Sequence, residues 1–212
     1  MRILVLGASG GCGSWVTRLA ANKNHVVTAI VRPDTQYQPP PGVVVQRANA
    51  IDPNDLSSAV EGQDAVISCI GPQRINPRNP WSALRPPPHC AELTARAVVS
   101  ALHNSSVRRF AAISAAGVAD SFDMVNRVMR SLIRRSTIGS MYADLEAMEQ
   151  VFVESNLDWV AVRPVTLVNA APSTRTKLLT RIGILSIVGR GDVAQWLLKV
   201  VEAPEPPRIA RL

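Results

Sequence analysis

Aromatic residues are scarce in this sequence, where Trp, Tyr and Phe together make up 4% of 212 residues. Proteins that bind single-stranded nucleic acid stack bases on aromatic side chains set beside basic ones. The chain has 23 Lys and Arg against 16 Asp and Glu, a net charge of +7, but the basic residues are not interleaved with aromatic ones. We therefore expect no nucleic-acid partner, and the positive charge suits an anionic small molecule equally well.

Cysteines and long apolar runs are also few. Three cysteines are an odd number in a chain without a secretory signal, which argues against a disulfide framework (Cys12, Cys69, Cys90). The first apolar run ends at Gly7, too early for a signal sequence or a membrane span. His89 and His103 show no metal-ligand spacing with the cysteines. We expect a cytoplasmic protein with reduced thiols, no membrane partner and no metal.

Short apolar runs alternate with amphipathic segments from end to end, which is typical of βαβ units around a parallel sheet. The hydrophobic content of 47% is sufficient for one complete core. We predict an α/β fold, a Rossmann-type doubly wound parallel sheet in a single domain over residues 1–212. The expected strands are 3–6, 26–31, 43–47, 65–70, 110–114 and 159–163, and the expected helices are 11–21, 54–61, 90–102, 141–155 and a last one capped by Asp192.

Two stretches interrupt this alternation and are predicted to be small insertions that cover the substrate. The first, near residues 72–88, lies in a segment with six prolines and offers Arg74 and Trp81 as parts of a lid. The second, near residues 121–140, is expected to form a basic amphipathic helix. Its arginines could receive an acidic substrate, although a solvated helix face is the commoner explanation.

The segment Gly7-Ala8-Ser9-Gly10-Gly11-Cys12-Gly13 follows the first strand and opens the first helix. In this context the first glycine permits a tight turn, the second lets the backbone approach a pyrophosphate, and the third lets the helix pack on the sheet. The free N–H groups of the helix N-terminus favour an anion there. The motif predicts a dinucleotide site formed by Gly7, Ser9, Gly10, Gly11, Cys12 and Gly13.

The end of the second strand favours NADP over NAD. NAD-binding domains place an acidic residue there to hold the ribose 2′-hydroxyl, whereas this chain has Arg32. A guanidinium can pair with a 2′-phosphate that a carboxylate would repel. The alternative is that Arg32 is a solvated strand end and that Asp34 takes the acidic role.

The chain resembles the atypical short-chain dehydrogenase/reductases, and among them the flavin reductase/biliverdin IXβ reductase group and the NmrA-like proteins. The resemblance covers nearly the whole chain and is carried by the glycine turn, Arg32 and segments 61–68, 142–144, 148–149 and 155–164. It implies further contacts with the cofactor. Asn49 and Ala50 would border the adenine, Ile70, Gly71 and Pro72 the ribose, and Pro164, Val165 and Thr166 the nicotinamide.

Two hydroxyl groups are candidates for catalysis. Ser114 ends the fifth strand, where the resemblance implies a serine that hydrogen-bonds the substrate carbonyl, although it could equally cap the strand end. Tyr142 corresponds to the dehydrogenase tyrosine, but Glu146 stands where that motif has lysine. A carboxylate in this position would raise the phenol pKa, so a tyrosine that simply packs on the core is an equal alternative.

These observations indicate an NADPH-dependent oxidoreductase that transfers a hydride to a flavin, a tetrapyrrole, a quinone or a specialised-metabolite carbonyl. The resemblance offers two alternatives: an NmrA-like protein that binds NADP(H) without turnover, and a non-redox cyclase or isomerase on the same fold. A small-molecule substrate is the expected partner. The basic, partly apolar surface is also compatible with a homodimer.

Overall fold

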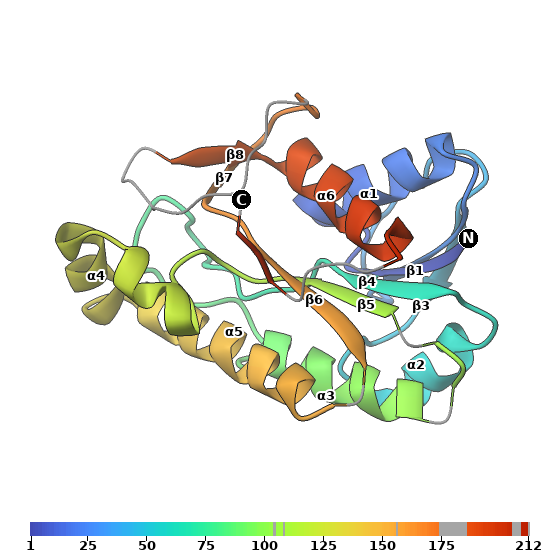
Figure 1. The fold of residues 1–212 in the computed structure, drawn as a ribbon, viewed down its shortest axis with the longest axis horizontal. Coiled ribbons are helices and arrows are strands. Elements are labelled where there is room, and N and C mark those ends of the chain that lie inside the picture. The colour runs from blue at the N-terminus through green and yellow to red at the C-terminus, as the bar shows by residue number, and fades with distance from the viewer. Residues whose placement is uncertain (104, 108, 156, 174–185, 205–208, 212) are drawn as a thin grey trace.

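The centre of the molecule is a seven-stranded sheet in which every pair of neighbouring strands is parallel (Figure 1). A computed structural model describes the chain except for residues 104, 108, 156, 174–185, 205–208 and 212. The strand order is β3-β2-β1-β4-β5-β6-β9, which confirms the predicted Rossmann-type architecture. The strands are β1 (Arg2–Leu6), β2 (Val26–Val31), β3 (Val44–Arg47), β4 (Ala65–Ser68), β5 (Arg109–Ile113), β6 (Asp158–Arg163) and β9 (Ile209–Arg211).

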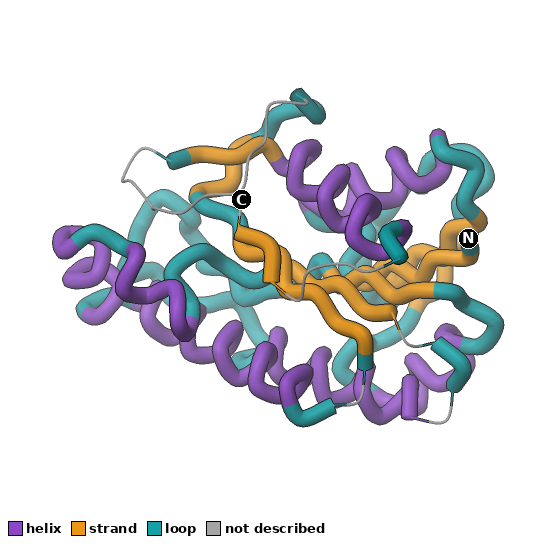
Figure 2. The backbone as a smooth tube through the Cα atoms, viewed as in Figure 1, coloured by secondary structure: helices purple, strands orange, loops and turns teal. Residues whose placement is uncertain are grey.

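Helices cover both faces of this sheet (Figure 2). On one face lie α1 (Gly11–Asn22) and α6 (Arg190–Glu202), and on the other α2 (Pro53–Val60), α3 (Cys90–His103) and α5 (Thr137–Val153). Alternate side chains of β1 serve the two faces: Ile3 and Val5 pack toward α1 and α6, and Leu4 and Leu6 toward the other layer. A strand buried on both faces must be apolar throughout, which explains the continuous hydrophobic runs of the sequence. Of the helices that the structure describes, none has the length and hydropathy of a transmembrane span.

The segment expected to form one basic helix is divided into three pieces, so that prediction was wrong. A 3₁₀ helix, η1 (Ala119–Met124), precedes α4 (Arg127–Arg134), and α5 already begins at Thr137. Asn126 caps α4 by accepting from the N–H of Met129 at 3.0 Å, and Ser136 caps α5 by accepting from Ile138 at 3.3 Å. Each polar side chain starts a new helix instead of continuing the previous one.

The sequence predicted that Asp192 caps the last helix, and this prediction was wrong. The helix α6 begins two residues earlier, after Gly189, which offers no capping side chain. The buried carboxylate of Asp192 instead accepts from the backbone N–H of Ser173 at 2.6 Å. Asp192 therefore ties the start of α6 to the segment that follows β7 (Thr166–Val168), a strand that pairs in parallel with β8 (Ile187–Gly189) in a second, two-stranded sheet.

Candidate functional site

The turn between β1 and α1 has a geometry that only glycine satisfies at two positions. Gly7 has a φ of +73°, in the left-handed region, and its carbonyl accepts from the N–H of Gly10 at 2.9 Å. A Cβ on Gly13 would overlap the carbonyl oxygen of Gly7. These two glycines therefore let α1 start directly against the end of β1.

The N-terminus of α1 is open to an anion. Its N-cap is Gly10, which supplies no side chain, and the first turn contains no acidic residue. Ser9 and Gly11 are exposed. The first N–H groups of a helix have no partner within it and carry the positive end of the helix dipole. The turn thus has the donor chemistry that a pyrophosphate requires, and its glycines add no side chains that would cover the backbone.

Two arginines flank the turn that follows β2. Arg32 is exposed directly after the strand, and Arg47 ends the neighbouring strand β3, where it is paired with Val31. Nη1 of Arg47 donates to the carbonyls of Pro33 at 2.7 Å and Thr35 at 3.0 Å and so fixes the shape of this turn. Sequence analysis missed Arg47, although its place at the end of an expected strand was a usable signal. Asp34, the alternative acidic residue, is exposed on the same turn.

The other residues expected to contact a cofactor follow the neighbouring strands at the same edge of the sheet. Ile70 lies against the glycine turn, since a Cβ on Gly7 would come within 2.9 Å of Ile70 Cγ1. A Cβ on Gly71 would meet nothing within 4 Å, so open space adjoins this backbone. Pro72 is half-buried.

Asn49 and Ala50 follow β3 in a tight turn. Oδ1 of Asn49 accepts from the N–H of Ile51 at 3.4 Å, and the N–H of Asn49 donates to Asp55 at 2.7 Å. The residue is exposed, whereas Ala50 is buried. The turn thus leaves the amide nitrogen of Asn49 at the surface of this edge, where it can donate.

After β6, the carbonyl of the buried Pro164 accepts from the N–H of Ala116 at 2.9 Å. This bond joins the ends of β5 and β6. Val165 is half-buried and Thr166 is exposed at the start of β7. Because all the central strands are parallel, these segments share the carboxyl edge of the sheet with the glycine turn (Figure 1).

Ser114 lies at this edge but takes part in a buried charged network. Its hydroxyl donates to Oε1 of Glu149 at 2.5 Å, and both residues are at most 5% exposed. Glu149 also accepts from Nε of Arg163 at 2.9 Å and forms an ion pair with Nη2 of the same guanidinium. Nη1 of Arg163 donates to Asp120 at 2.5 Å. Ser114, Glu149 and Arg163 thus connect β5, α5 and β6 beneath the site.

The guanidinium of Arg163 is charged despite its burial. Burial lowers the pKa of Arg163, but the hydrogen bonds and charges of Glu149 and Asp120 outweigh this effect and raise the net pKa. An unpaired charge buried in the protein would be strongly destabilising. The burial of Arg163 therefore depends on the two carboxylates that compensate its charge. Sequence analysis placed Arg163 in a strand-ending Arg-Pro segment and missed its partners.

Tyr142 points its phenol into the protein. The hydroxyl donates to the carbonyl of Ala116 at 3.0 Å, and the ring packs against Gly117. Burial raises the pKa of Tyr142. The direction agrees with the expectation from Glu146, but the cause is different, because the side chain of Glu146 is exposed. The phenol is therefore a neutral hydrogen-bond donor at neutral pH.

The proline-rich insertion folds into an irregular hairpin. Arg74 and Leu84 form an antiparallel bridge, and the hairpin is fastened to the junction of α4 and α5. Oγ1 of Thr137 donates to the carbonyls of Pro80 at 2.6 Å and Ser82 at 2.9 Å. The indole of Trp81, 62% exposed, donates to the carbonyl of Arg135 at 2.9 Å. The two insertions thus form one lobe beside the carboxyl edge of the sheet.

Arg190, the first residue of α6, lies over the glycine turn, and sequence analysis did not identify it. A Cβ on Gly11 would come within 2.7 Å of Cδ and Nε of Arg190. Nη1 of the same guanidinium donates to Oδ1 of Asn169 at 2.7 Å. No local pattern could have revealed this contact, because almost 180 residues separate the turn from α6.

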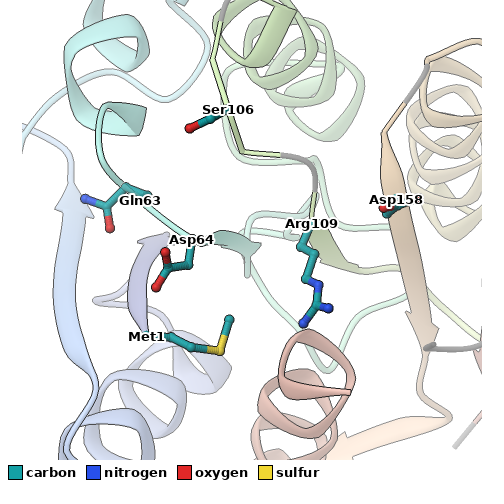
Figure 3. A pocket seen from close by; sticks show the side chains of 6 residues that line it. All are labelled: Met1, Gln63, Asp64, Ser106, Arg109 and Asp158. Atoms are coloured by element: carbon teal, nitrogen blue, oxygen red, sulfur yellow. The ribbon is translucent and has the colours of Figure 1, made fainter. Parts of the chain in front are cut away.

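A hollow of about 310 Å³ at the opposite, amino edge of the sheet is not part of this site (Figure 3). Two of its charged groups are bound within the protein: Asp64 accepts from the N–H of Arg2 at 2.7 Å, and Arg109 donates to the carbonyl of Val201 at 2.8 Å. The hollow is lined by Met1, Gln63, Asp64, Ser106, Arg109 and Asp158. Ligands of open parallel sheets bind at the carboxyl edge instead.

Comparisons with known proteins agree with this geometry. A family profile described as NAD(P)H-binding matches residues 7–204. No protein with a curated function matches the sequence.

Solved structures share the fold. The anaerobillin reductase ChuY from Escherichia coli O157:H7 is 20% identical with a TM-score of 0.77, over 100% of this chain and 96% of that one. The oxidoreductase YlbE from Lactococcus lactis is 15% identical with a TM-score of 0.77, over 100% and 90%. A short-chain dehydrogenase/reductase from Veillonella parvula is 18% identical with a TM-score of 0.73, over 96% and 87%.

Proposed function

Because this chain belongs to the NAD(P)H-binding family, we propose that it is an NADPH-dependent reductase of a conjugated small-molecule acceptor. The observation that carries the proposal is the uncapped N-terminus of α1 within the glycine turn, at the edge of the sheet where the segments after β4 and β6 also lie. Backbone N–H groups there would hold the pyrophosphate. The segments of Ile70 to Pro72 and of Pro164 to Thr166 would border the ribose and the nicotinamide.

The preference for NADPH over NADH rests on the turn after β2. Arg32 is exposed there, and Arg47 adds a second positive charge beside it. The 2′-phosphate distinguishes the two cofactors, and a planar guanidinium can bind it through two parallel hydrogen bonds. Asn49, on the next turn, would donate to the adenine through its amide.

The reaction proposed is the transfer of a hydride, which is the chemistry that bound NADPH supplies. The hydroxyl of Tyr142 donates a hydrogen bond to the carbonyl of Ala116, and the hydroxyl of Ser114 donates one to Glu149. We therefore assign Ser114 the role of accepting or orienting a polar group of the acceptor, and Tyr142 that of shaping the pocket wall. A conjugated acceptor suits this arrangement, because it spreads the charge of the added hydride and can take its proton from water.

The acceptor class proposed is a flavin, a tetrapyrrole or a quinone. One structure with the same fold is described as an anaerobillin reductase, which supports including linear tetrapyrroles among the acceptors tested. Trp81, on the lobe built from the two insertions, is exposed and offers a flat apolar surface. An extended ring system would contact such a surface through stacking.

The hydroxyls of Ser114 and Tyr142 donate within the protein, and this also favours one other function, an NADP(H)-binding sensor without turnover. Such a protein would need the glycine turn and Arg32 but no proton donor. The two functions differ in whether the bound cofactor is oxidised.

The first test is a titration of the purified protein with NADPH and NADH, followed in the same cuvette by the nicotinamide absorbance after adding flavins, quinones and a linear tetrapyrrole. Binding with oxidation supports the reductase. Binding without oxidation of any acceptor favours the sensor. If neither cofactor binds, the proposal is wrong.

The preference for NADPH has its own test in the variant Arg32→Ala. We expect a loss of about 1.5–3 kcal/mol in NADPH binding, typical of a hydrogen-bonded charge pair, and little change for NADH. Asp34→Ala, on the same turn, is the matched control and should leave NADPH binding intact. Equal losses for both cofactors in Arg32→Ala would contradict the role of this residue.

A further inference from the structure

The side chain of Arg190 approaches the glycine turn from a distant part of the chain. The position that a Cβ would take on Gly11 lies 2.7 Å from Cδ and Nε of Arg190 and 3.6 Å from its guanidinium carbon. Gly11 is the first residue of α1, and its N–H is one of those without a partner inside the helix. The guanidinium therefore lies directly beside the groups proposed to hold the pyrophosphate.

The position of Arg190 is fixed from two sides. Its Nη1 donates to Oδ1 of Asn169 at 2.7 Å. The next residue, Gly191, donates its N–H to the carbonyl of Ala170 at 3.0 Å, and a Cβ there would come within 2.5 Å of Pro172. Asp192 then holds the backbone of Ser173 at 2.6 Å. The start of α6 is thus attached residue by residue to the segment 169–173.

The charge of Arg190 acts on the turn and has no carboxylate partner of its own among the described residues. The arginines that form salt bridges within the described ranges are Arg96, Arg130 and Arg163. Burial raises the pKa of Cys12, in the same turn, to about 11, and the charge of Arg190 partly counteracts this effect. A guanidinium that is held in place and lies at a helix N-terminus adds to the positive field that already favours an anion.

We propose that Arg190, positioned by Asn169, binds the pyrophosphate of the cofactor from above the glycine turn. This inference rests on the proposed function, because it presupposes a dinucleotide in the turn. Asn169 follows β7, and the first residue of β7, Thr166, belongs to the segment proposed to border the nicotinamide. The pair of Asn169 and Arg190 therefore links the two ends of the cofactor site, so that a pyrophosphate bound at the turn also orders the strand beside the nicotinamide.

The test compares cofactor affinities of Arg190→Gln with those of the native protein by fluorescence or calorimetric titration. NADPH and NADH share the pyrophosphate, so both affinities should fall by the same factor, about tenfold or more, as expected for losing a charge-assisted hydrogen bond. The affinity for adenosine 2′-monophosphate, which has no pyrophosphate, should not change. Arg32→Ala should show the opposite pattern, with losses for NADPH and adenosine 2′-monophosphate alone.

Lys199→Gln is the matched control. It removes one positive charge from the same helix, but Lys199 is exposed and lies over the ring of Trp196 at 4.9 Å, away from the turn. Both cofactors should bind this variant as they bind the native protein. A general effect of net charge would instead weaken binding equally in both variants and would overturn the assignment.

Circular dichroism and thermal unfolding establish that Arg190→Gln is folded. If Arg190→Gln does not fold, Asn169→Ala provides the same comparison, because it removes only the anchor of the guanidinium. Its affinities for NADPH and NADH should fall by equal factors, smaller than those expected for Arg190→Gln. Native affinities in the folded variant would refute the role of Arg190 and leave the proposed function standing. Failure of the native protein to bind either cofactor would refute both.

Discussion

At the scale of single residues, the main result is that polar groups at the carboxyl edge divide into two kinds. Ser114 is buried and Tyr142 is half-buried, and both hydroxyls donate hydrogen bonds to acceptors within the protein. Arg32 and Ser9 are exposed. The hydrogen of each hydroxyl of the first kind is held within the protein, so Ser114 could meet an acceptor only through its oxygen lone pairs, whereas the second kind is exposed to a ligand.

The buried pair of Glu149 and Arg163 makes a strong prediction about stability. In Glu149→Gln the buried guanidinium loses its main counter-charge, and we expect the free energy of unfolding to fall by about 3 kcal/mol. Urea denaturation followed by circular dichroism measures this change. Glu146→Gln is the control: it makes the same chemical change at an exposed position of α5 and should stay within about 0.5 kcal/mol of the native value. If the free energy of unfolding falls no further in Glu149→Gln than in Glu146→Gln, the pair of Glu149 and Arg163 does not stabilise the protein.

Tyr142 predicts a pH dependence with a defined sign. Burial raises its pKa in the folded protein, so the protonated phenol contributes stability that is fully present below the unfolded pKa. That contribution is lost as the pH rises through the folded pKa. Stability should therefore fall more steeply above about pH 10 in the native protein than in Tyr142→Phe, which has no ionisable group there.

The measurement is an alkaline absorbance titration of phenolate formation. The chain has two tyrosines, so the difference between the native protein and Tyr142→Phe isolates this one phenol. A midpoint at or below the ordinary tyrosine value would contradict the buried position and would reopen Tyr142 as an acid.

At the scale of elements, α3 receives its cap from another helix. The carboxylate of Asp144, on α5, is buried and accepts from the N–H groups of Ala91 at 3.1 Å and Glu92 at 2.9 Å. It satisfies two donors of the first turn of α3 and places a negative charge at the positive end of that helix. The contact also sets how α3 and α5 pack.

Removing this cap should destabilise the protein without touching the cofactor edge. We expect Asp144→Ala to lower the free energy of unfolding by about 1–2 kcal/mol, the usual range for a lost N-cap. Asp144→Asn should lose less, because its amide oxygen can still accept one bond. Ser140→Ala, exposed on the same helix, is the control for thermal unfolding. An unchanged unfolding temperature in Asp144→Ala would mean that water replaces the cap at no cost.

At the scale of the whole molecule, hydrophobic pattern and turn chemistry predicted the architecture. The runs beginning at Ile3 and Val26 lie in strands of the sheet, and the glycine turn stands between β1 and α1. These features are local, because strand and turn preferences depend on residues near one another in the chain. The predictions that failed, the cap at Asp192 and the single helix over 121–140, both concern helix starts. There a polar side chain can bind either a nearby backbone group or a partner far away in the sequence.

What the sequence could not predict are contacts between distant segments. Glu149 meets Arg163 and Ser114 only after α5 has packed against β5 and β6, and Arg190 reaches Gly11 only once α6 lies beside α1. The residues that flank each of them in the sequence form no motif that indicates its partner. Its partner is set by the packing of whole elements, which no window of nearby residues records.

The single direction of the strands gives the molecule two chemically different poles. Met1 directly precedes β1 and lines the hollow at the amino edge, whereas β9, parallel to β6, runs toward the carboxyl edge (Figure 1). A tether or dye attached at Met1 would stand at the pole remote from the glycine turn. Immobilised on a sensor chip by this residue, the protein would present its proposed cofactor site to the flowing solution.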